Sequence, residues 1–209
     1  EGVVYDEWSD ALHMVDRMPD GWQQWRKLRV IDFGYVNPFV CQWWAIDPDD
    51  RMYRYREIYM TKRTVAEHAE RINLLSSGEA YEATICDHDA EDRATLQAAG
   101  IYSAGAVKDV SRGIQAVRNR LARGADDKPR LVMLRGALVE TDAALAEARK
   151  PVCTEQELPG YVWQTTADGR PDKEEPLKIN DHGCDAMRYA VMYVDNPLRL
   201  ERAENPFYQ

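Results

Sequence analysis

Three consecutive strand-like runs constrain the fold of this 209-residue chain more than any other feature. β-Branched and aromatic residues are concentrated at residues 28–33, 38–46 and 52–60, and only short connections separate these runs. Short connections join neighbouring strands that run in opposite directions. The sequence therefore predicts a three-strand antiparallel meander.

After the meander, helices and strands alternate. Apolar residues recur at helical spacing from Val65 to Leu75, and Thr64 with Glu67 three residues later forms a capping-box pattern. Further strands are expected at residues 81–87, 101–107 and 130–134, and further helices at 91–100 and 110–124. This order favours parallel pairing, so we predict an α/β fold whose mixed sheet extends the antiparallel meander by parallel strands and is flanked by helices.

The remaining segments complete one domain. Residues 141–150 are typical of a helix, residues 161–176 predict a hairpin or extended loop around Asp168 and Gly169, and a last helix is expected from about Asp181 to Val194. We place the domain at residues 28–195. A lead-in or linker precedes it at 1–27, and a polar tail follows at 196–209.

Composition narrows the class of protein. With 44% hydrophobic and 30% charged residues, the chain resembles soluble globular proteins. Its apolar runs fall far short of the roughly 20 residues that span a bilayer, and its first residues lack a signal-peptide pattern, so we expect a cytoplasmic protein without a membrane partner. The four cysteines form no CxxC pair and indicate neither a disulfide framework nor a zinc ribbon.

The formal net charge of -9 argues against a protein that coats nucleic acid through bulk positive charge. From Lys108 to Arg135, however, the sign reverses. This stretch is either a phosphate-contacting face or a solvated helix side rich in arginine. Arg112, Arg118 and Arg120 are the candidates for phosphate contacts.

Two acids end predicted strands, where α/β sheets place their sites. A carboxylate at such a position is costly to bury unless it is paired or binds a cation. Taken alone, Asp32 is explained as a turn acceptor beside Gly34, which would supply an unusual backbone angle. Asp87 is explained as an N-cap or first-turn charge on the next helix. Other acids compete for that role: Asp89, Glu91 and Asp92.

The last helix carries two more acids, one turn apart. Asp181 and Asp185 are expected on one helix face with Arg188 beside them, and like charges at that spacing repel. The helix N-terminus explains Asp181, and Asn180 is available as N-cap. Asp185 flanks the apolar face and is harder to explain without a cation.

Acids from two strand ends and a helix fit a carboxylate cage for Mg²⁺ or Mn²⁺, because hard cations select oxygen ligands. Two ions roughly 4 Å apart would activate water and stabilise the leaving oxygen in phosphodiester hydrolysis. A rival zinc site would use the flanking residues Cys86, His88, His182 and Cys184. Their spacings are unusual for zinc, and packing around the acids explains them more simply. Neither GxxxxGK[ST] nor GxGxxG occurs, so ATP hydrolysis by the P-loop route is not expected.

Four stretches carry a family resemblance in their order along the chain. They are VIDFGYVNPFVCQWWAID, RMYRYREIYMTKRTVAEHAERI, ATICDHDAEDRATLQAAGI and LKINDHGCDAMRYAVMYV. Together they resemble the C-terminal nuclease domain of the large terminase subunit of tailed phages, over most of residues 1–195. EGVVYDEW resembles the strand by which this family leaves its ATPase domain.

The resemblance implies an RNase H-like fold related to the RuvC-type resolvases. It implies that Asp32 bridges two metal ions, that Asp87 matches the second acid and that Asp185 matches the acid of the last helix. Asp181 is then an auxiliary metal ligand. These residues would make the domain a Mg²⁺- or Mn²⁺-dependent endodeoxyribonuclease.

The family cuts concatemeric double-stranded phage DNA with little sequence preference, while an adjoining ATPase domain pumps the DNA into a procapsid. Its members also engage the portal protein and the small terminase subunit. The implied location is the host cytoplasm, transiently at the procapsid portal.

Two other functions stay open. A structure-selective resolvase or an RNase H-type nuclease would share the carboxylate cage, whereas a non-catalytic docking domain of a packaging motor would bind no metal. Asp-x-Gly before a hairpin also opens actin- and hexokinase-like nucleotide-binding folds. Those folds expect a second Gly/Thr-rich phosphate hairpin, and the sequence contains none.

Overall fold

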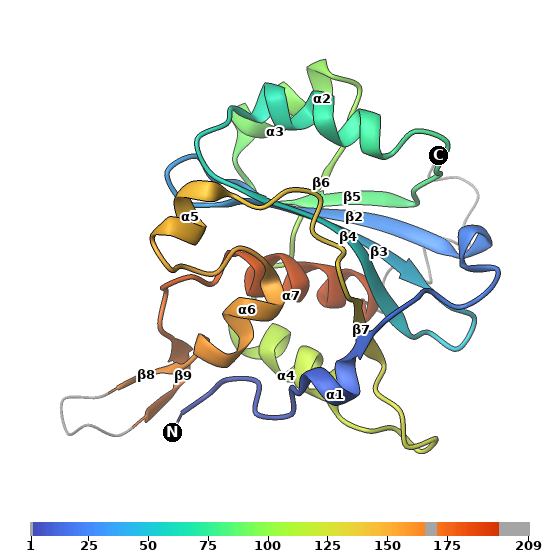
Figure 1. Ribbon diagram of the computed structural model, residues 1–209, viewed down its shortest axis with the longest axis vertical. Helices are drawn as coiled ribbons and strands as arrows, with labels where there is room; N and C mark the ends of the chain where they lie inside the picture. Colours follow the sequence, from blue (N-terminus) through green and yellow to red (C-terminus); the bar gives the residue numbers. More distant parts are fainter. Residues whose placement is uncertain (1, 166–170, 197–209) are drawn as a thin grey trace.

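The computed structural model describes residues 2–165 and 171–196, except for the side chains of residues 171–174. A seven-stranded mixed sheet forms its centre (Figure 1). The strands are β1 (Met14–Val15), β2 (Arg26–Asp32), β3 (Phe39–Ile46), β4 (Met52–Met60), β5 (Ala83–Cys86), β6 (Ala104–Gly105) and β7 (Leu131–Leu134). Their order across the sheet is β1-β7-β4-β3-β2-β5-β6.

Helices cover both faces of this sheet. They are α1 (Asp10–His13), α2 (Val65–Leu75), α3 (Ala90–Ala98), α4 (Val110–Leu121), α5 (Ala143–Glu147), α6 (Thr154–Glu157) and α7 (His182–Val194), with 3-10 turns η1 (Trp22–Gln24) and η2 (Leu158–Gly160). Figure 1 shows α2 and α3 on one face and α4, α6 and α7 on the other, and each face has its own buried apolar cluster. Within the described ranges, no helix has the length and apolar character needed to cross a membrane.

The predicted meander is confirmed, because β3 pairs antiparallel with both β2 and β4. Parallel pairing of β5 with β2 and of β7 with β4 extends the sheet on both sides, as expected from the alternation of helices and strands. The capping box at the start of α2 is also confirmed, with the Glu67 N–H donating to Thr64 Oγ1 at 3.3 Å. The strand expected over residues 101–107 is reduced to the two residues of β6.

The predicted hairpin is present as strands β8 (Trp163–Thr165) and β9 (Pro171–Pro176), which pair antiparallel outside the main sheet. The residues proposed for its turn, Asp168 and Gly169, lie outside the described residues, as does the predicted tail from residue 197.

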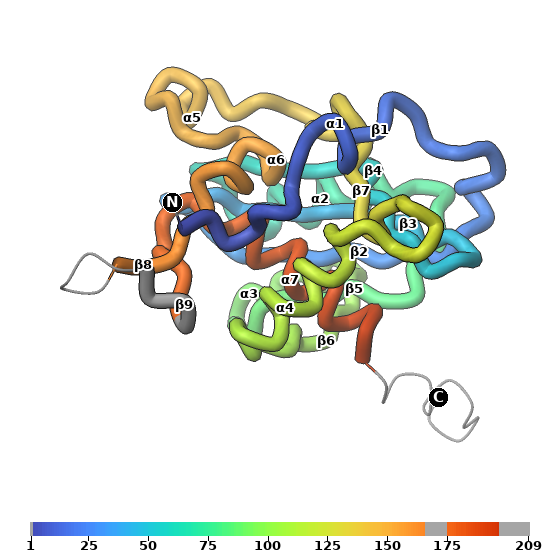
Figure 2. The backbone as a smooth tube through the Cα atoms, turned by 90° about the horizontal axis from the view of Figure 1, so that it is seen from below, coloured from blue at the N-terminus to red at the C-terminus, as the bar shows by residue number. Residues whose placement is uncertain are grey.

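The segment predicted as a lead-in packs against the domain. Val4 and Tyr5 are 0% and 1% exposed, and the Val4 N–H donates to the Tyr161 carbonyl at 2.8 Å. Figure 2 shows the N-terminal segment alongside α6 and β8. Further on, β1 pairs with β7 and so joins the sheet edge. Residues 2–27 are therefore part of the packed structure, while the domain boundary at residue 28 and a link to an ATPase domain stay predictions.

Candidate active site

The carboxyl ends of β2 and β5 bring Asp32 and Asp87 together. The two strands are parallel and Ile31 pairs with Cys86, so the next residue of each strand lies at the same edge of the sheet. The residues two positions before the acids both belong to the apolar cluster on the α7 side. Because side chains alternate along a strand, both acids are directed toward α7.

Helix α7 supplies the other two acids. It packs against β2, β3 and β5, with Asp181 as its N-cap residue and Asp185 in its first turn. Asn180, the expected N-cap, lies one residue earlier in the left-handed region with a φ of 51°. All four acids, Asp32, Asp87, Asp181 and Asp185, line one cleft of about 630 Å³. The structure thus brings the predicted site residues to one place.

Asp32 is the buried member of this group, with 8% of its surface exposed. Its Oδ2 lies 3.0 Å from His182 Nδ1. Burial raises the pKa of Asp32 to about 6, the carboxylates of Asp185 and Asp87 add to the shift, and the hydrogen bond to His182 opposes it. Positive charge entering the cleft would therefore favour loss of the Asp32 proton.

The contact with Asp32 also changes the pKa of His182. Burial alone would lower its pKa, but the hydrogen bond and the charge of Asp32 raise it above the usual value. Asp32 and His182 therefore shift each other's pKa. Sequence reasoning placed His182 either as a zinc ligand or in the packing around the acids, but nothing along the chain identifies Asp32 as its partner.

Asp87 and Asp185 are each paired with a cationic side chain. Lys108 Nζ forms an ion pair with Asp87 Oδ1, and Arg188 Nη2 lies 2.5 Å from Asp185 Oδ1. Partial burial raises the pKa of Asp87, but hydrogen bonds from Lys108 and a backbone N–H bring it below the usual value. Asp89, not Asp87, caps α3, so the carboxylate of Asp87 is left to the cleft.

Arg188 reaches Asp185 past the backbone of α4. Its side chain is buried, and Gly113 makes room for it, because a Cβ at that position would lie 2.4 Å from Arg188 Cγ. Over the described part of the chain, Arg188 Nε and Nη1 have no hydrogen-bond partner. The ion pair with Asp185 is therefore the main polar anchor of this guanidinium.

The loop after β2 lines the same cleft through Phe33, Asn37 and Pro38. A Cβ on Gly34 would lie 2.4 Å from the Pro38 carbonyl oxygen, so only glycine allows this loop to fold back on itself. Gly34 is not among the glycines with positive φ. The expectation of an unusual backbone angle was wrong, and close packing of the loop explains this glycine instead.

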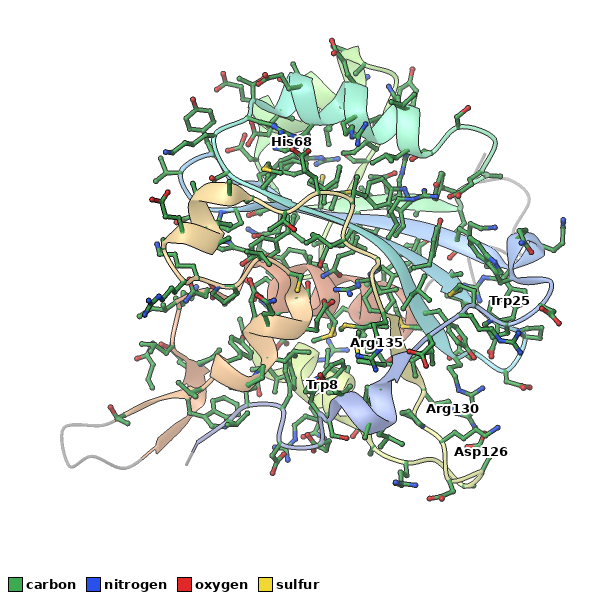
Figure 3. The ribbon with its side chains drawn as sticks, viewed as in Figure 1. Trp8, Trp25, His68, Asp126, Arg130 and Arg135 are labelled. Carbon is green, nitrogen blue, oxygen red and sulfur yellow. The ribbon has the colours of Figure 1, made fainter. Side chains whose placement is uncertain are left out.

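Ion pairs neutralise most of the basic stretch from Lys108 to Arg135. The pairs are Arg118 with Asp6 and Glu7, Arg120 with Asp50 and Asp195, Arg123 with Asp127, Arg130 with Asp126, and Arg135 with Asp16. Figure 3 shows Arg130 beside Asp126, on the opposite side of the molecule from α5. Arg118 and Arg120 are both held by acids far from them in sequence, so a phosphate contact from either would require an ion pair to break. Arg112 lines a separate hollow beside α4.

Other cations line the acidic cleft. They are Lys108, Lys150 and Lys178, from three separate loops. Among the residues that the structure describes, Lys150 and Lys178 make no ion pair, in contrast to most arginines of the chain. Sequence reasoning missed these lysines because each stands alone in a loop of mixed charge.

The donor chemistry of the cleft fits a hard divalent cation, since carboxylate oxygens are the ligands that Mg²⁺ and Mn²⁺ prefer. No three His, Cys, Asp or Glu side chains in the described ranges are arranged to hold a metal ion. Asp87 and Asp185 form ion pairs with Lys108 and Arg188 instead. Metal binding by these acids would therefore require them to exchange one cationic partner for another.

The alternative zinc site is excluded by the placement of its ligands. Cys86 and Cys184 are buried in the two apolar clusters on opposite faces of the sheet. His88 Nε2 lies 2.7 Å from the Ala106 carbonyl oxygen, and His182 contacts Asp32. These four side chains do not converge.

The similarity of this chain to known proteins is found among solved structures. No protein-family model matches the chain, and no curated protein matches it. The large terminase of the thermophilic bacteriophage D6E superposes with a TM-score of 0.72 at 24% identity, over 92% of this chain and 44% of that chain. The P22 large terminase nuclease domain superposes with a TM-score of 0.67 at 15% identity, over 92% of both chains. This chain has the fold of a large-terminase nuclease domain.

A third solved structure adds a metal. The nuclease domain of the large terminase from bacteriophage SPP1, solved with bound Mn, gives a TM-score of 0.63 at 18% identity, over 91% of this chain and 98% of that domain. The chain therefore spans nearly all of the isolated nuclease domains but less than half of the D6E large terminase. The predicted RNase H-like fold class is confirmed, and the roles of Asp32, Asp87, Asp181 and Asp185 stay predictions.

Proposed function

We propose that this chain is the nuclease part of a phage DNA-packaging terminase and hydrolyses phosphodiester bonds of double-stranded DNA with Mg²⁺ or Mn²⁺. One observation carries the proposal. Four carboxylates line a single cleft at the carboxyl ends of β2 and β5, in a fold shared with nuclease domains of which one was solved with Mn.

Asp32, Asp87 and Asp185 are the proposed catalytic metal ligands, and Asp181 is an auxiliary ligand. Two divalent ions bound there would supply a water molecule activated as nucleophile and stabilisation of the leaving oxygen. His182 Nδ1 contacts the Asp32 carboxylate from the α7 side at 3.0 Å. Because burial raises the pKa of Asp32 to about 6, this carboxylate is in its cation-binding form above that pH.

The lysines of the cleft suit a polyanionic substrate. Lys150 and Lys178 line the cleft beside the acids and form no ion pair within 4 Å among the described residues. Lys108 would be released from its ion pair if Asp87 bound a metal ion. Phosphate contacts from lysine position a nucleic acid without reading its sequence. This arrangement supports cutting with little sequence preference.

The proposed partners follow from the same reading. The D6E large terminase is more than twice as long as its matched part, which leaves room in such a protein for an ATPase domain. We extend this to the present chain and propose an ATPase domain in the same polypeptide. The portal protein and the small terminase subunit are further proposed partners, and the host cytoplasm is the proposed location.

A substrate panel tests the function. The wild-type protein and the Asp32→Asn variant are incubated with plasmid, a four-way junction and an RNA:DNA hybrid, with Mn²⁺, with Mg²⁺ or with a chelator. We expect plasmid cleavage that requires metal and is lost in Asp32→Asn, because the amide keeps the shape but loses the charge. Asp16→Asn, whose side chain is 87% exposed and pairs with Arg135, is the matched control and should cut normally.

Each contrary result favours a named alternative. Cleavage of junctions or hybrids with intact plasmid would favour a resolvase or an RNase H-type nuclease. No cleavage of any substrate, together with no Mn²⁺ binding by calorimetry, would favour a docking domain.

A further inference from the structure

The first turn of α7 is capped in an unusual way. Helices α3, α4 and α5 each begin at an aspartate whose side chain accepts N–H groups of its own first turn. Asp181 holds the same N-cap position in α7, but its side chain makes no such bond. Aspartate is among the most favoured N-cap residues, so a free carboxylate at this position needs an explanation.

Glu157, at the end of α6, accepts the hydrogen bonds that an N-cap side chain would ordinarily accept from the first turn of α7. Its Oε1 accepts the Gly183 N–H at 3.0 Å, and its Oε2 accepts the Cys184 N–H at 2.8 Å. Gly183 and Cys184 are the second and third residues of α7, whose N–H groups an N-cap side chain ordinarily satisfies. The cap of α7 therefore comes from another helix, 26 residues earlier in the chain.

The surroundings of Glu157 hold its carboxylate in this position. It is 1% exposed, and the Tyr59 hydroxyl donates to Oε1 at 2.5 Å. Burial raises the pKa of Glu157 to about 8, while hydrogen bonds from Tyr59 and the two N–H groups oppose the shift. Negative charge on the carboxylate would be stabilised by the helix N-terminus that it faces.

Two further contacts fix the same turn. Gln42 Nε2, from β3, donates to the Gly183 carbonyl at 3.0 Å. A Cβ on Gly183 would lie 2.2 Å from Thr154 Oγ1, so glycine is needed for α6 to approach this closely. The start of α7 is thus clamped between α6 and the sheet, next to the cleft.

We propose that Glu157 is a positioning residue that caps α7 in place of Asp181 and so leaves the Asp181 carboxylate free for the cleft. The consequence for metal binding rests on the proposed function. Without the Glu157 carboxylate, Asp181 is adjacent to the vacated N–H groups and takes over the cap. Its charge then leaves the cleft.

The test compares Glu157→Gln in two backgrounds, the wild-type protein and the Asp181→Ala variant. Amide hydrogen exchange at Gly183 and Cys184 reports the cap without any metal. We expect Glu157→Gln alone to keep both amides protected, because glutamine retains one acceptor oxygen and Asp181 replaces the oxygen that becomes an amide NH2. The double variant should exchange about tenfold faster, as expected for loss of an N-cap. Equal exchange in the single and double variants would overturn the proposal.

Mn²⁺ calorimetry gives a second readout on the same proteins. Glu157→Gln should weaken Mn²⁺ binding by roughly tenfold in the wild-type background, on the scale of one cap interaction, and leave it unchanged in the Asp181→Ala background. The same fold-change in both backgrounds would overturn the proposal, because a general structural defect would not depend on Asp181. Glu147→Gln, the same substitution at an exposed position in α5, is the control and should bind Mn²⁺ like the wild type.

The two proposals fail separately. If the wild-type protein binds no Mn²⁺, the proposed function fails, and amide exchange still decides whether Asp181 and Glu157 compete for the cap. If the wild-type protein binds Mn²⁺ and the Glu157→Gln variant binds it equally well, the cap proposal fails alone.

Discussion

His182 Nδ1 lies 3.0 Å from Asp32 Oδ2 and joins the first turn of α7 to the end of β2, across 150 residues of chain. The carboxylate is buried beside two other acids, and the contact with the imidazole opposes the resulting rise in its pKa. The contact therefore links the ionisation of Asp32 to the position of α7, and the stability of the fold should depend on pH through this pair.

The Asp32→Asn variant should become more stable than the wild type as the pH rises. The pKa of Asp32 is raised from 3.8 to about 6, so its contribution to stability is complete below pH 3.8 and is lost as the pH rises through about 6. The raised pKa of His182 acts in the same direction. Between pH 4 and pH 8, we expect the free energy of unfolding of the variant to gain about 1 to 3 kcal/mol on the wild type, measured by urea denaturation.

Asp16→Asn is the control for this measurement, because its side chain is 87% exposed. Its difference from the wild type should not change with pH. A difference between Asp32→Asn and the wild type that is likewise constant from pH 4 to pH 8 would show that Asp32 has an ordinary pKa.

Lys108→Met should strengthen Mn²⁺ binding by the metal-free protein. Lys108 is paired with Asp87, so a divalent ion must displace it to reach that carboxylate. Exposed ion pairs are weak, and removing this competitor should raise the affinity by about two- to fivefold in calorimetry. Lys128→Met, on the α4–β7 connection, removes the same charge away from the cleft and should leave the affinity unchanged. Weaker Mn²⁺ binding by Lys108→Met would mean that the lysine supports the site instead of competing for it.

The parts of the fold that depend on local pattern could be predicted from the sequence. The strands of the meander and the capping box of α2 are encoded by residues close together in the chain. β1 has only two residues and acquires its partner near residue 133, so no local pattern indicated that the N-terminal segment joins the sheet. A strand as short as β1 forms only because it pairs with the edge strand β7.

The residues of the candidate site likewise fall into those that a local pattern reveals and those that it does not. Asp32 and Asp87 could be found because each acid ends a recognisable strand. Glu157 and Lys108 could not, because their importance comes from partners on other elements. Arg118 and Arg120 show the converse, since acids distant in sequence form ion pairs with charges that look free along the chain.

Lys150→Ala combined with Lys178→Ala should weaken DNA binding and reduce its salt dependence. Both lysines line the cleft and have no ion-pair partner among the described residues. Each phosphate contact that is lost lowers the slope of log affinity against log salt by about 0.9, so we expect a decrease of about 2. Fluorescence anisotropy with duplex DNA over a range of salt concentrations measures it.

The charge-matched control for this pair is Arg123→Ala with Lys128→Ala, both exposed, on the connection from α4 to β7 and not lining the cleft. It should leave the salt slope close to the wild-type value. If both double variants lower the slope equally, DNA responds to the overall charge of the protein and the cleft lysines have no special role.

Gly113→Ala should destabilise the protein even though alanine favours helices over glycine by up to about 1 kcal/mol. The added Cβ would lie 2.4 Å from Arg188 Cγ and 2.6 Å from Cδ, and the buried arginine has little room to move away. We expect a loss of about 1 to 3 kcal/mol in the free energy of unfolding, as for other overpacked interiors. Gly160→Ala is the control, because nothing lies within 4 Å of its Cβ, and its effect should stay within about 0.5 kcal/mol. If Gly113→Ala instead stabilises the protein, the helix preference of alanine outweighs the clash between its Cβ and Arg188. The ion pair of Arg188 with Asp185 then does not require glycine at position 113.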